Sequence, residues 1–215
     1  MLGKTRIETR RRAHPVLRSR FAQAPPQGNG IGRHAQTSRI FPRPPQNTFR
    51  KGIEAHRICG VSAAIRQYEP RDFTAIFKLD QSCFPPGIAY SKTMLRYYLA
   101  QTGAECLIAG DGAKILGFLI SEENPPLGHI VTLDVAASHR RKGVGSMLLG
   151  ESEAHMAFRG VCTVLLETAT TNEAGIAFWE RHGYRREAVV KNYYPGRLDA
   201  FEMRKLLSAA PRSKA

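Results

Sequence analysis

Apolar residues in the middle of the chain first recur with the spacing of a helix. After Asp72 they occupy positions that share one helical face: Phe73, Ile76, Phe77 and Leu79. We expect this helix to end near Cys83, because Pro85 and Pro86 lack the backbone N–H groups that would continue it. Ser91 is a good N-cap residue and predicts a second helix that runs to about residue 100.

The next part of the chain changes to the short apolar runs that are typical of strands. Three strands are predicted, over residues 105–109, 114–121 and 129–135. Turn signals separate them, first at Asp111 and Gly112 and then at Pro125 and Pro126. The pattern therefore predicts three consecutive antiparallel strands.

The C-terminal half alternates helices and strands. Helices are predicted over residues 144–158 and 172–182, ended by Gly160 and Gly183, with Thr171 or Asn172 capping the second. Strands are predicted over residues 161–166, 184–190 and 200–205. A strand, a helix and a second strand in this order imply a parallel crossover, so the predicted fold class is α/β (α+β) with a mixed sheet.

Charge divides the chain unevenly. Residues 1–60 hold 13 lysines and arginines but only Glu8 and Glu54, a net charge of +11, whereas residues 61–215 have a net charge of +3. We expect residues 1–60 to be a basic, proline-rich disordered extension, residues 61–207 the folded domain and residues 208–215 a disordered tail. Three interpretations of the extension stay open: a segment that binds RNA or ribosomes, a transit peptide, or upstream sequence from a misplaced start codon.

Cysteine spacing and hydropathy narrow the class of protein. Cys59, Cys83, Cys106 and Cys162 are far apart and form no Cys-x-x-Cys pair, so we expect neither a metal site nor a disulfide framework. No apolar run approaches the roughly 18 residues of a membrane-spanning helix. We therefore predict a cytoplasmic protein without a membrane partner.

The candidate chemistry lies where the predicted strand at 129–135 leads into the helix at 144–158. The connecting residues are basic and rich in glycine: Arg140, Arg141, Lys142, Gly143, Val144 and Gly145. Glycines let the backbone turn tightly, and N–H groups at a helix start have no helical partners, so the segment is suited to bind a pyrophosphate. Neither the dinucleotide-binding fingerprint nor the phosphate loop of NTPases fits, because the glycine and Gly-Lys-Ser/Thr positions that they require are absent.

This segment resembles the Gln/Arg-x-x-Gly-x-Gly/Ala motif of the GNAT superfamily, the acyl-CoA-dependent N-acetyltransferases. A second block is similar to the Asn-containing helix of that family and to the Gly-Phe/Tyr pair at its end. Its residues are Leu166, Glu167, Thr168, Asn172, residues 177–180, His182, Gly183 and Tyr184. A third block, residues 191–195 with Asp199, Ala200 and Met203, resembles protein N-terminal acetyltransferases, especially the bacterial ribosomal-protein-alanine type. The resemblance covers about residues 62–207 and implies a mixed, mostly antiparallel central sheet with helices on both faces.

The resemblance also implies that acetyl-CoA is the cosubstrate. Its implied contacts are the turn, the helix start and the preceding strand: Leu133, Asp134, Val135, Arg140, Arg141, Lys142, Gly143, Val144, Gly145 and Ser146. Asn172 is implied as a further contact, and helix capping is an equally good interpretation of this residue. Trp179 stands where the family has a tyrosine that acts as an acid, and indole cannot donate that proton; it is expected beside the cofactor or packed in the core.

Acetyl transfer to an amine needs a base for the ammonium proton and an acid for the leaving thiolate. The resemblance implies Glu167 as the base, with a pKa raised by burial, and the structural alternative is an ion pair with a neighbouring Arg or Lys. His129 is the second catalytic candidate, and Tyr193, Tyr194 or solvent is the candidate acid. The resemblance implies that two loops bind the acceptor through Phe84, Pro85, Tyr90, Tyr193 and Tyr194, and the alternative is that Phe84 and one of the tyrosines belong to the core.

We therefore predict an enzyme that moves an acetyl group from acetyl-CoA to the α-amine of a protein or peptide N-terminus, with ribosomal proteins among the candidate acceptors. Transfer to a small amine or to a lysine side chain is the alternative within the same enzyme class. A CoA-binding protein without turnover, docked to RNA or ribosomes through its basic extension, is the alternative of another class. We expect a monomer or a weak dimer.

Overall fold

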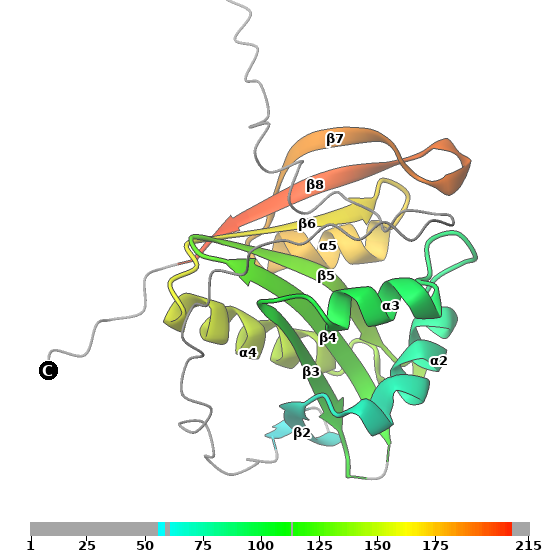
Figure 1. The fold of residues 1–215 in the computed structure, drawn as a ribbon, viewed down its shortest axis with the longest axis vertical. Coiled ribbons are helices and arrows are strands. Elements are labelled where there is room, and N and C mark those ends of the chain that lie inside the picture. The colour runs from blue at the N-terminus through cyan, green and yellow to red at the C-terminus, as the bar shows by residue number, and fades with distance from the viewer. Residues whose placement is uncertain (1–55, 59–60, 113, 208–215) are drawn as a thin grey trace, which may run out of the picture.

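A computed structural model describes residues 56–58, 61–112 and 114–207 as one sheet with helices packed against it (Figure 1). The helices are α2 (Phe73–Cys83), α3 (Lys92–Leu99), α4 (Val144–Phe158) and α5 (Glu173–Arg181), with short 3-10 turns η1 (Pro70–Asp72), η2 (Ala137–His139) and η3 (Pro195–Arg197). The strands are β1 (His56–Ile58), β2 (Val61–Gln67), β3 (Ala104–Gly110), β4 (Ile115–Asn124), β5 (Leu127–Val135), β6 (Thr163–Ala169), β7 (Arg185–Tyr194) and β8 (Leu198–Leu206).

The described strands form an eight-stranded sheet in the order β1-β2-β3-β4-β5-β6-β8-β7. Neighbouring strands are antiparallel except β5 and β6, which run parallel and are joined by a crossover through α4. The structure therefore confirms the predicted mixed, mostly antiparallel sheet with a local parallel crossover.

The sheet carries an apolar core on each face. One face is covered by α4 and α5 and includes Leu107 and Leu119 from β3 and β4. The opposite face is covered by α2 and α3 and includes their neighbours Ile108 and Ile120. Because successive strand residues point to opposite faces, the nearly continuous apolar runs of β3 and β4 fill both cores. Helices on both faces are thus confirmed.

The two parallel strands separate partway along their length. They pair only over residues 127–129 of β5 and 163–165 of β6, although β5 continues to Val135 and β6 to Ala169. Before the open part, Val131 is left unmatched between two register pairs with β4, a bulge that bends β5. Figure 1 shows β5 and β6 diverging along their length. One edge of β5 is therefore left with backbone groups that a ligand can pair with.

The predicted helices agree with the structure within one or two residues, and the helix at 144–158 matches α4 at both ends. The predicted strand at 161–166 is displaced, because β6 begins at Thr163 and includes Glu167. The sequence pattern did not predict β1 or β2. Since β1 lies within residues 1–60, strand pairing begins before the expected domain boundary at residue 61. Residues 1–55 and 208–215 lie outside the described part, so the disorder expected for them stays a prediction.

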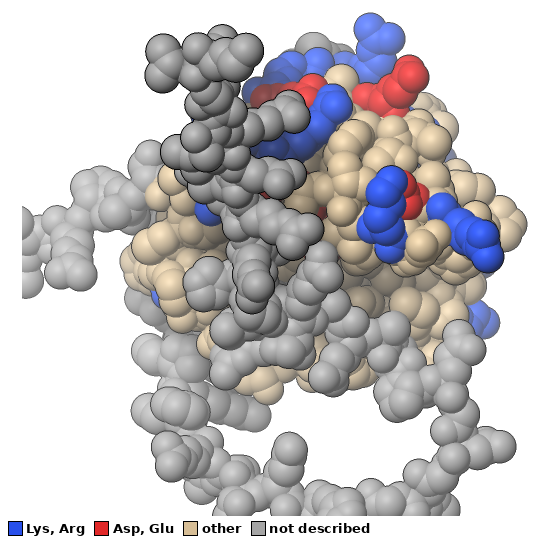
Figure 2. Space-filling view, turned by 90° about the horizontal axis from the view of Figure 1, so that it is seen from above, with Lys and Arg blue, Asp and Glu red and all other residues tan. Residues whose placement is uncertain are grey.

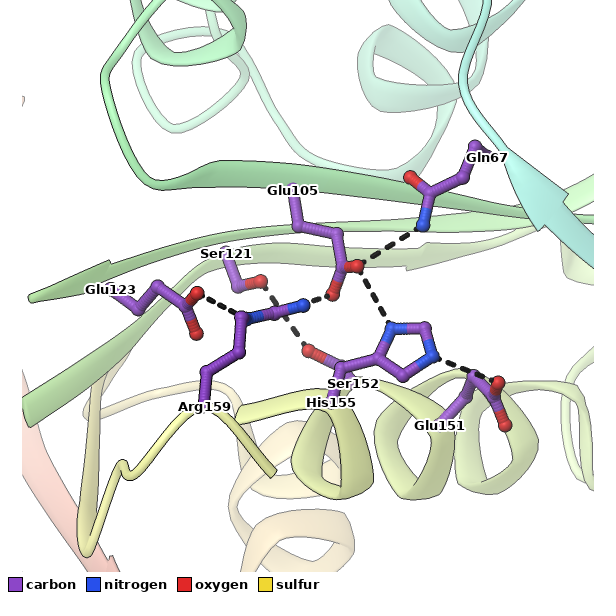
Figure 3. Close-up of polar contacts among 8 residues, drawn as sticks. All are labelled: Gln67, Glu105, Ser121, Glu123, Glu151, Ser152, His155 and Arg159. Atoms are coloured by element: carbon purple, nitrogen blue, oxygen red, sulfur yellow. Dashed lines mark hydrogen bonds and ion pairs between the residues drawn. The ribbon is translucent and has the colours of Figure 1, made fainter. Parts of the chain in front are cut away.

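A polar network ties the C-terminal half of α4 to β2, β3 and β4 (Figure 3). Glu105 on β3 accepts hydrogen bonds from Gln67 Nε2 at 3.1 Å, from His155 at 2.8 Å and from Arg159 at 3.3 Å. Arg159 also pairs with Glu123 on β4. Because the Glu105 side chain is only 10% exposed, these donors replace water around its charge, and breaking them would leave a buried carboxylate unpaired.

Positive and negative side chains are interspersed over the described surface that Figure 2 shows. Ion pairs of this mixed kind lie on and beside β7 and β8: Arg186 with Glu180, Lys191 with Asp199, and Arg204 with Glu187. Because residues 61–215 have a net charge of only +3, the strong positive charge of the chain comes mainly from residues 1–60. Among the described residues, no helix combines the length and the apolar character that crossing a bilayer requires.

Candidate active site

The segment before α4 makes a tight turn that exposes backbone donors. Arg141 and Gly143 have φ angles of 60° and 86°, in the left-handed region, so the chain reverses just before the helix. Gly143 is the N-cap and has no side chain to bond the first helical N–H groups, which belong to Val144, Gly145 and Ser146. These donors and the positive end of the helix dipole make the turn a suitable anion site.

Side chains hold this turn against the neighbouring elements. Arg140 Nε donates to the carbonyl oxygen of Val135, at the end of β5, over 3.0 Å. Gly145 lies against Phe178 of α5, because a Cβ added at Gly145 would be 3.3 Å from its ring. Glycine at this position therefore lets α4 begin close to α5. Three cationic side chains are exposed around the turn, those of Arg140, Arg141 and Lys142.

The open edge of β5 presents mainly backbone to a ligand. Leu133 and Val135 direct their side chains to the core under α4 and α5. Asp134 points to the other face and is 1% exposed. Thr132 Oγ1 donates to Asp134 Oδ1 at 2.7 Å, while burial raises the pKa of this carboxyl to about 8. Because these side chains occupy the two faces, the groups left at the open edge are N–H and C=O.

Two residues predicted as cofactor contacts have structural roles. Asn172 Oδ1 accepts from Gly175 N at 3.0 Å and its Nδ2 donates to Thr168 Oγ1 at 3.3 Å, so Asn172 caps α5. Trp179 is 8% exposed and packs edge-on against Tyr184 in the core. Capping and packing are therefore confirmed, and a contact of either residue with acetyl-CoA stays a prediction.

The three residues predicted to be catalytic lie together. His129 Nε2 is 2.8 Å from Glu167 Oε2, and Tyr193 Oη donates to the same oxygen over 3.2 Å. His129 belongs to the paired part of β5, Glu167 to β6 beyond the point of separation, and Tyr193 to the end of β7. The Glu167 side chain retains 18% exposure, so part of it stays open to solvent.

The expectation that burial raises the pKa of Glu167 is wrong in its net direction. Burial is the largest influence and does raise this pKa, but the charge and hydrogen bond of His129 and the hydroxyl of Tyr193 together lower it below the ordinary value. Burial likewise lowers the pKa of His129, but the carboxylate of Glu167 outweighs it and raises that pKa. The hydrogen-bond partners of Glu167 are therefore a histidine and a tyrosine rather than an Arg or Lys.

The two segments predicted to bind the acceptor lie against each other. A Cβ added at Gly87, in the loop between α2 and α3, would be 3.6 Å from Pro195 Cβ in the turn between β7 and β8. In the second segment, the rings of Tyr193 and Tyr194 pack edge-on with 4.8 Å between centroids. The first segment holds a half-buried Phe84, an exposed Pro85 and a half-buried Tyr90. The two segments are therefore close together, and contact of their residues with an acceptor stays a prediction.

Asp80 is a further buried carboxylate beside the site, and the sequence reasoning missed it. It lies in the last turn of α2 and accepts a hydrogen bond from the backbone N–H of Tyr90. A signal was present, because position 80 continues the helical spacing of Phe73, Ile76 and Phe77. A carboxylate on the buried stripe of an amphipathic helix indicates a dedicated hydrogen-bonding role.

A segment that contains this turn, the separated strands and α5 matches a known family. Residues 73–184, just over half of the chain, match the model described as the acetyltransferase (GNAT) family. This chain belongs to the GNAT acetyltransferase family. The resemblance inferred from the turn and from the blocks around Glu167 and Gly183 is thereby confirmed.

Relatives of this GNAT acetyltransferase include enzymes named for protein N-termini. N-alpha-acetyltransferase 30 of Schizosaccharomyces pombe is 31% identical over 117 residues, which cover 52% of this chain and 78% of the relative. The ribosomal protein bS18-alanine N-acetyltransferase of Escherichia coli is 32% identical over 93 residues, covering 42% of this chain and 63% of the relative. A crystal structure of a ribosomal-protein-alanine N-acetyltransferase from Escherichia coli aligns with a TM-score of 0.62 and 25% identity, over 71% of this chain and 99% of that one.

Proposed function

We propose that this protein transfers an acetyl group from acetyl-CoA to the α-amine of a protein N-terminus. The observation that carries the proposal is the grouping of His129, Glu167 and Tyr193 where β5 and β6 separate. The relatives named as N-terminal acetyltransferases support the same acceptor class.

Acetyl-CoA supplies an acetyl group that is already activated as a thioester. The first N–H groups of α4 would hold its pyrophosphate, with Arg140, Arg141 and Lys142 adding positive charge. The open backbone edge at Leu133 and Val135 would hold the extended arm, as a neighbouring strand would. The left-handed turn, the helix start without a side-chain cap and the strand edge that β6 leaves open are features that fit this cosubstrate.

The nearby side chains can take up and supply the protons of the reaction. With Glu167 ionised and His129 neutral, the pair accepts one proton from the acceptor ammonium and stores it on His129, whose positive charge Glu167 stabilises. Burial and the charge of Glu167 raise the pKa of Tyr193, which therefore stays protonated at neutral pH. Tyr193 is the acid that we assign to the leaving thiolate, in place of the usual tyrosine replaced by Trp179. When the C–S bond breaks, the nitrogen loses its second proton to the Tyr193 oxygen, so the amide, the thiol and one proton on His129 remain.

The acceptor would lie between the loop that holds Phe84, Pro85 and Tyr90 and the turn that follows Tyr193 and Tyr194. Tyrosines suit an extended peptide because the ring covers the chain and the hydroxyl bonds its backbone. Contact of the basic extension with RNA, a ribosomal acceptor and a cytoplasmic location stay predictions.

The proposal is tested with purified protein, acetyl-CoA and matched peptides. One peptide has a free N-terminus and no lysine, a second has a blocked N-terminus and one lysine, and mass spectrometry locates the added acetyl group. We expect modification of the first peptide only. Equal modification of the blocked peptide, or acetyl-CoA binding with no transfer to any α-amine, would refute the proposal.

A further inference from the structure

Asp80 is fully buried at the end of α2, directly before the loop that is proposed to bind the acceptor. Its Oδ2 atom accepts hydrogen bonds from Tyr90 N at 2.9 Å and from Gln81 Nε2 at 2.8 Å. Gln81 Nε2 also donates to the carbonyl oxygen of Tyr90 at 2.9 Å. Two adjacent helix residues therefore bind both backbone polar groups of Tyr90.

The side chain of Tyr90 continues this connection to the reactive strand. Its hydroxyl donates to the carbonyl oxygen of Val131 at 3.1 Å. Val131 is the bulged residue of β5, two positions after His129. The ring is also held edge-on by Tyr98 of α3, with 5.4 Å between centroids. Contacts thus run without a gap from Asp80 through Tyr90 to the strand that carries His129.

We infer that Asp80 is a positioning residue, which acts through Tyr90 to hold the acceptor-binding loop at a fixed place over the catalytic residues. This inference rests on the proposed function, since it assigns the loop to the acceptor. Asp80 itself touches no reacting group and takes no part in the proton transfers.

The chemistry of Asp80 is unusual for a residue that only fills space. Its second oxygen, Oδ1, is buried and has no hydrogen-bond partner among the described residues, so the carboxylate carries a desolvation cost. The same burial raises the pKa of the Asp80 carboxyl to about 6. An apolar residue at position 80 would avoid the desolvation cost and continue the apolar stripe of α2. It could not, however, accept the hydrogen bond from Tyr90 N.

The inference is tested by the kinetics of Asp80→Ala and Asp80→Asn with a peptide acceptor. In Asp80→Ala the Tyr90 N–H loses its acceptor, so we expect the peptide KM to rise about tenfold, the effect of losing one hydrogen bond to a charged group. The dissociation constant for acetyl-CoA, measured by calorimetry, should stay unchanged. Asp80→Asn keeps an oxygen that can accept both bonds and should restore the peptide KM to within about twofold of the wild-type value.

Two further variants separate positioning from general stability. Asp72→Asn removes another buried charge from the start of the same helix, where Asp72 binds Arg66 at 2.6 Å, and should lower the melting temperature without changing the peptide KM. Gln81→Ala changes an exposed residue, so it should fold even if Asp80→Ala does not, and it should raise the peptide KM by losing the bond to Tyr90 O.

An unchanged peptide KM in Asp80→Ala and Gln81→Ala would overturn the inference and leave the proposed function intact. A rise in peptide KM that Asp72→Asn reproduces would also overturn it. Failure of the wild-type protein to acetylate any α-amine would instead refute the proposed function, and with it the role assigned to the loop.

Discussion

His129 Nε2 lies 2.8 Å from Glu167 Oε2, although the two residues are 38 positions apart and belong to strands that pair over only three residues each. Each partner changes the proton affinity of the other: the pKa of Glu167 is lowered and that of His129 is raised. Glu122, directly opposite His129 on β4, adds to the rise. The pair therefore titrates as a unit, and its upper step lies above the ordinary value of histidine.

Replacing Glu167 with Gln should lower kcat by a factor of about 10² to 10⁴, the usual contribution of a general base. The acidic limb of the kcat–pH profile should also move to lower pH, because His129 loses the charge that raises its pKa and keeps the burial that lowers it. Glu187→Gln, an exposed glutamate on β7, is the matched control. A full-rate Glu167→Gln enzyme would remove Glu167 from the mechanism.

Replacing Tyr193 with Phe should lower kcat about tenfold or more while leaving acetyl-CoA affinity unchanged, because it removes a proton donor and keeps the ring. The hydroxyl is 3.2 Å from Glu167 Oε2, so the variant should also raise the pKa of Glu167. Tyr97→Phe, at an exposed tyrosine on α3, should behave as wild type. An unaltered kcat in Tyr193→Phe would assign the acid role to another group or to solvent.

Replacing Gly145 with Ala should weaken acetyl-CoA binding, since the new Cβ would lie 3.3 Å from the Phe178 ring and push the start of α4 away from α5. Gly150→Ala is a matched control in the middle of α4, where an added Cβ meets nothing within 4 Å. The control should stabilise the protein by up to about 1 kcal/mol through helix propensity and leave binding unchanged. Calorimetric titration with CoA measures the difference, and equal affinities in both variants would contradict the assignment of the turn.

Replacing Glu105 with Gln should lower the free energy of unfolding by about 2 kcal/mol, because Arg159 and His155 lose their shared buried carboxylate. Burial raises the pKa of Glu105, but the hydrogen bond and the charge of His155 and the charge of Arg159 outweigh it and lower this pKa. The contribution of Glu105 to stability is therefore complete above the ordinary glutamate pKa and is lost as pH falls through the lowered value. The pKa of His155 is raised mainly by its hydrogen bond to Glu105, so its contribution is complete below the ordinary histidine pKa and is lost as pH rises through the raised value.

The difference in stability between wild type and Glu105→Gln should therefore be largest between about pH 5 and pH 6.5. Urea unfolding at a series of pH values measures it, with Glu187→Gln at an exposed position on β7 as the control. A difference that does not change with pH would show that the network contributes through packing rather than through charge.

Features that depend on neighbours in the chain could be predicted from the sequence. The turn before α4 needs Gly143, Gly145 and three cations within a few positions, and all of them can be read together. The caps Ser91 and Asn172 each act on an N–H group three residues away, so the starts of α3 and α5 were also predictable. The residue types of the predicted catalytic group came from a family resemblance, which identifies positions without describing their surroundings.

Only the tertiary structure decided what those surroundings are. The sign of the pKa change at Glu167 depends on His129, a residue on another strand, and burial alone predicts the opposite sign. The role of Asp80 depends on Tyr90 across a loop, and Trp179 proves to be a core residue because Tyr184 packs against it. The amino-acid sequence by itself determined the period and ends of most elements and the glycine-rich turn before α4, because backbone preference is local. Partners, burial and charge balance were decided by the fold, because they arise between residues that only the folded sheet brings together.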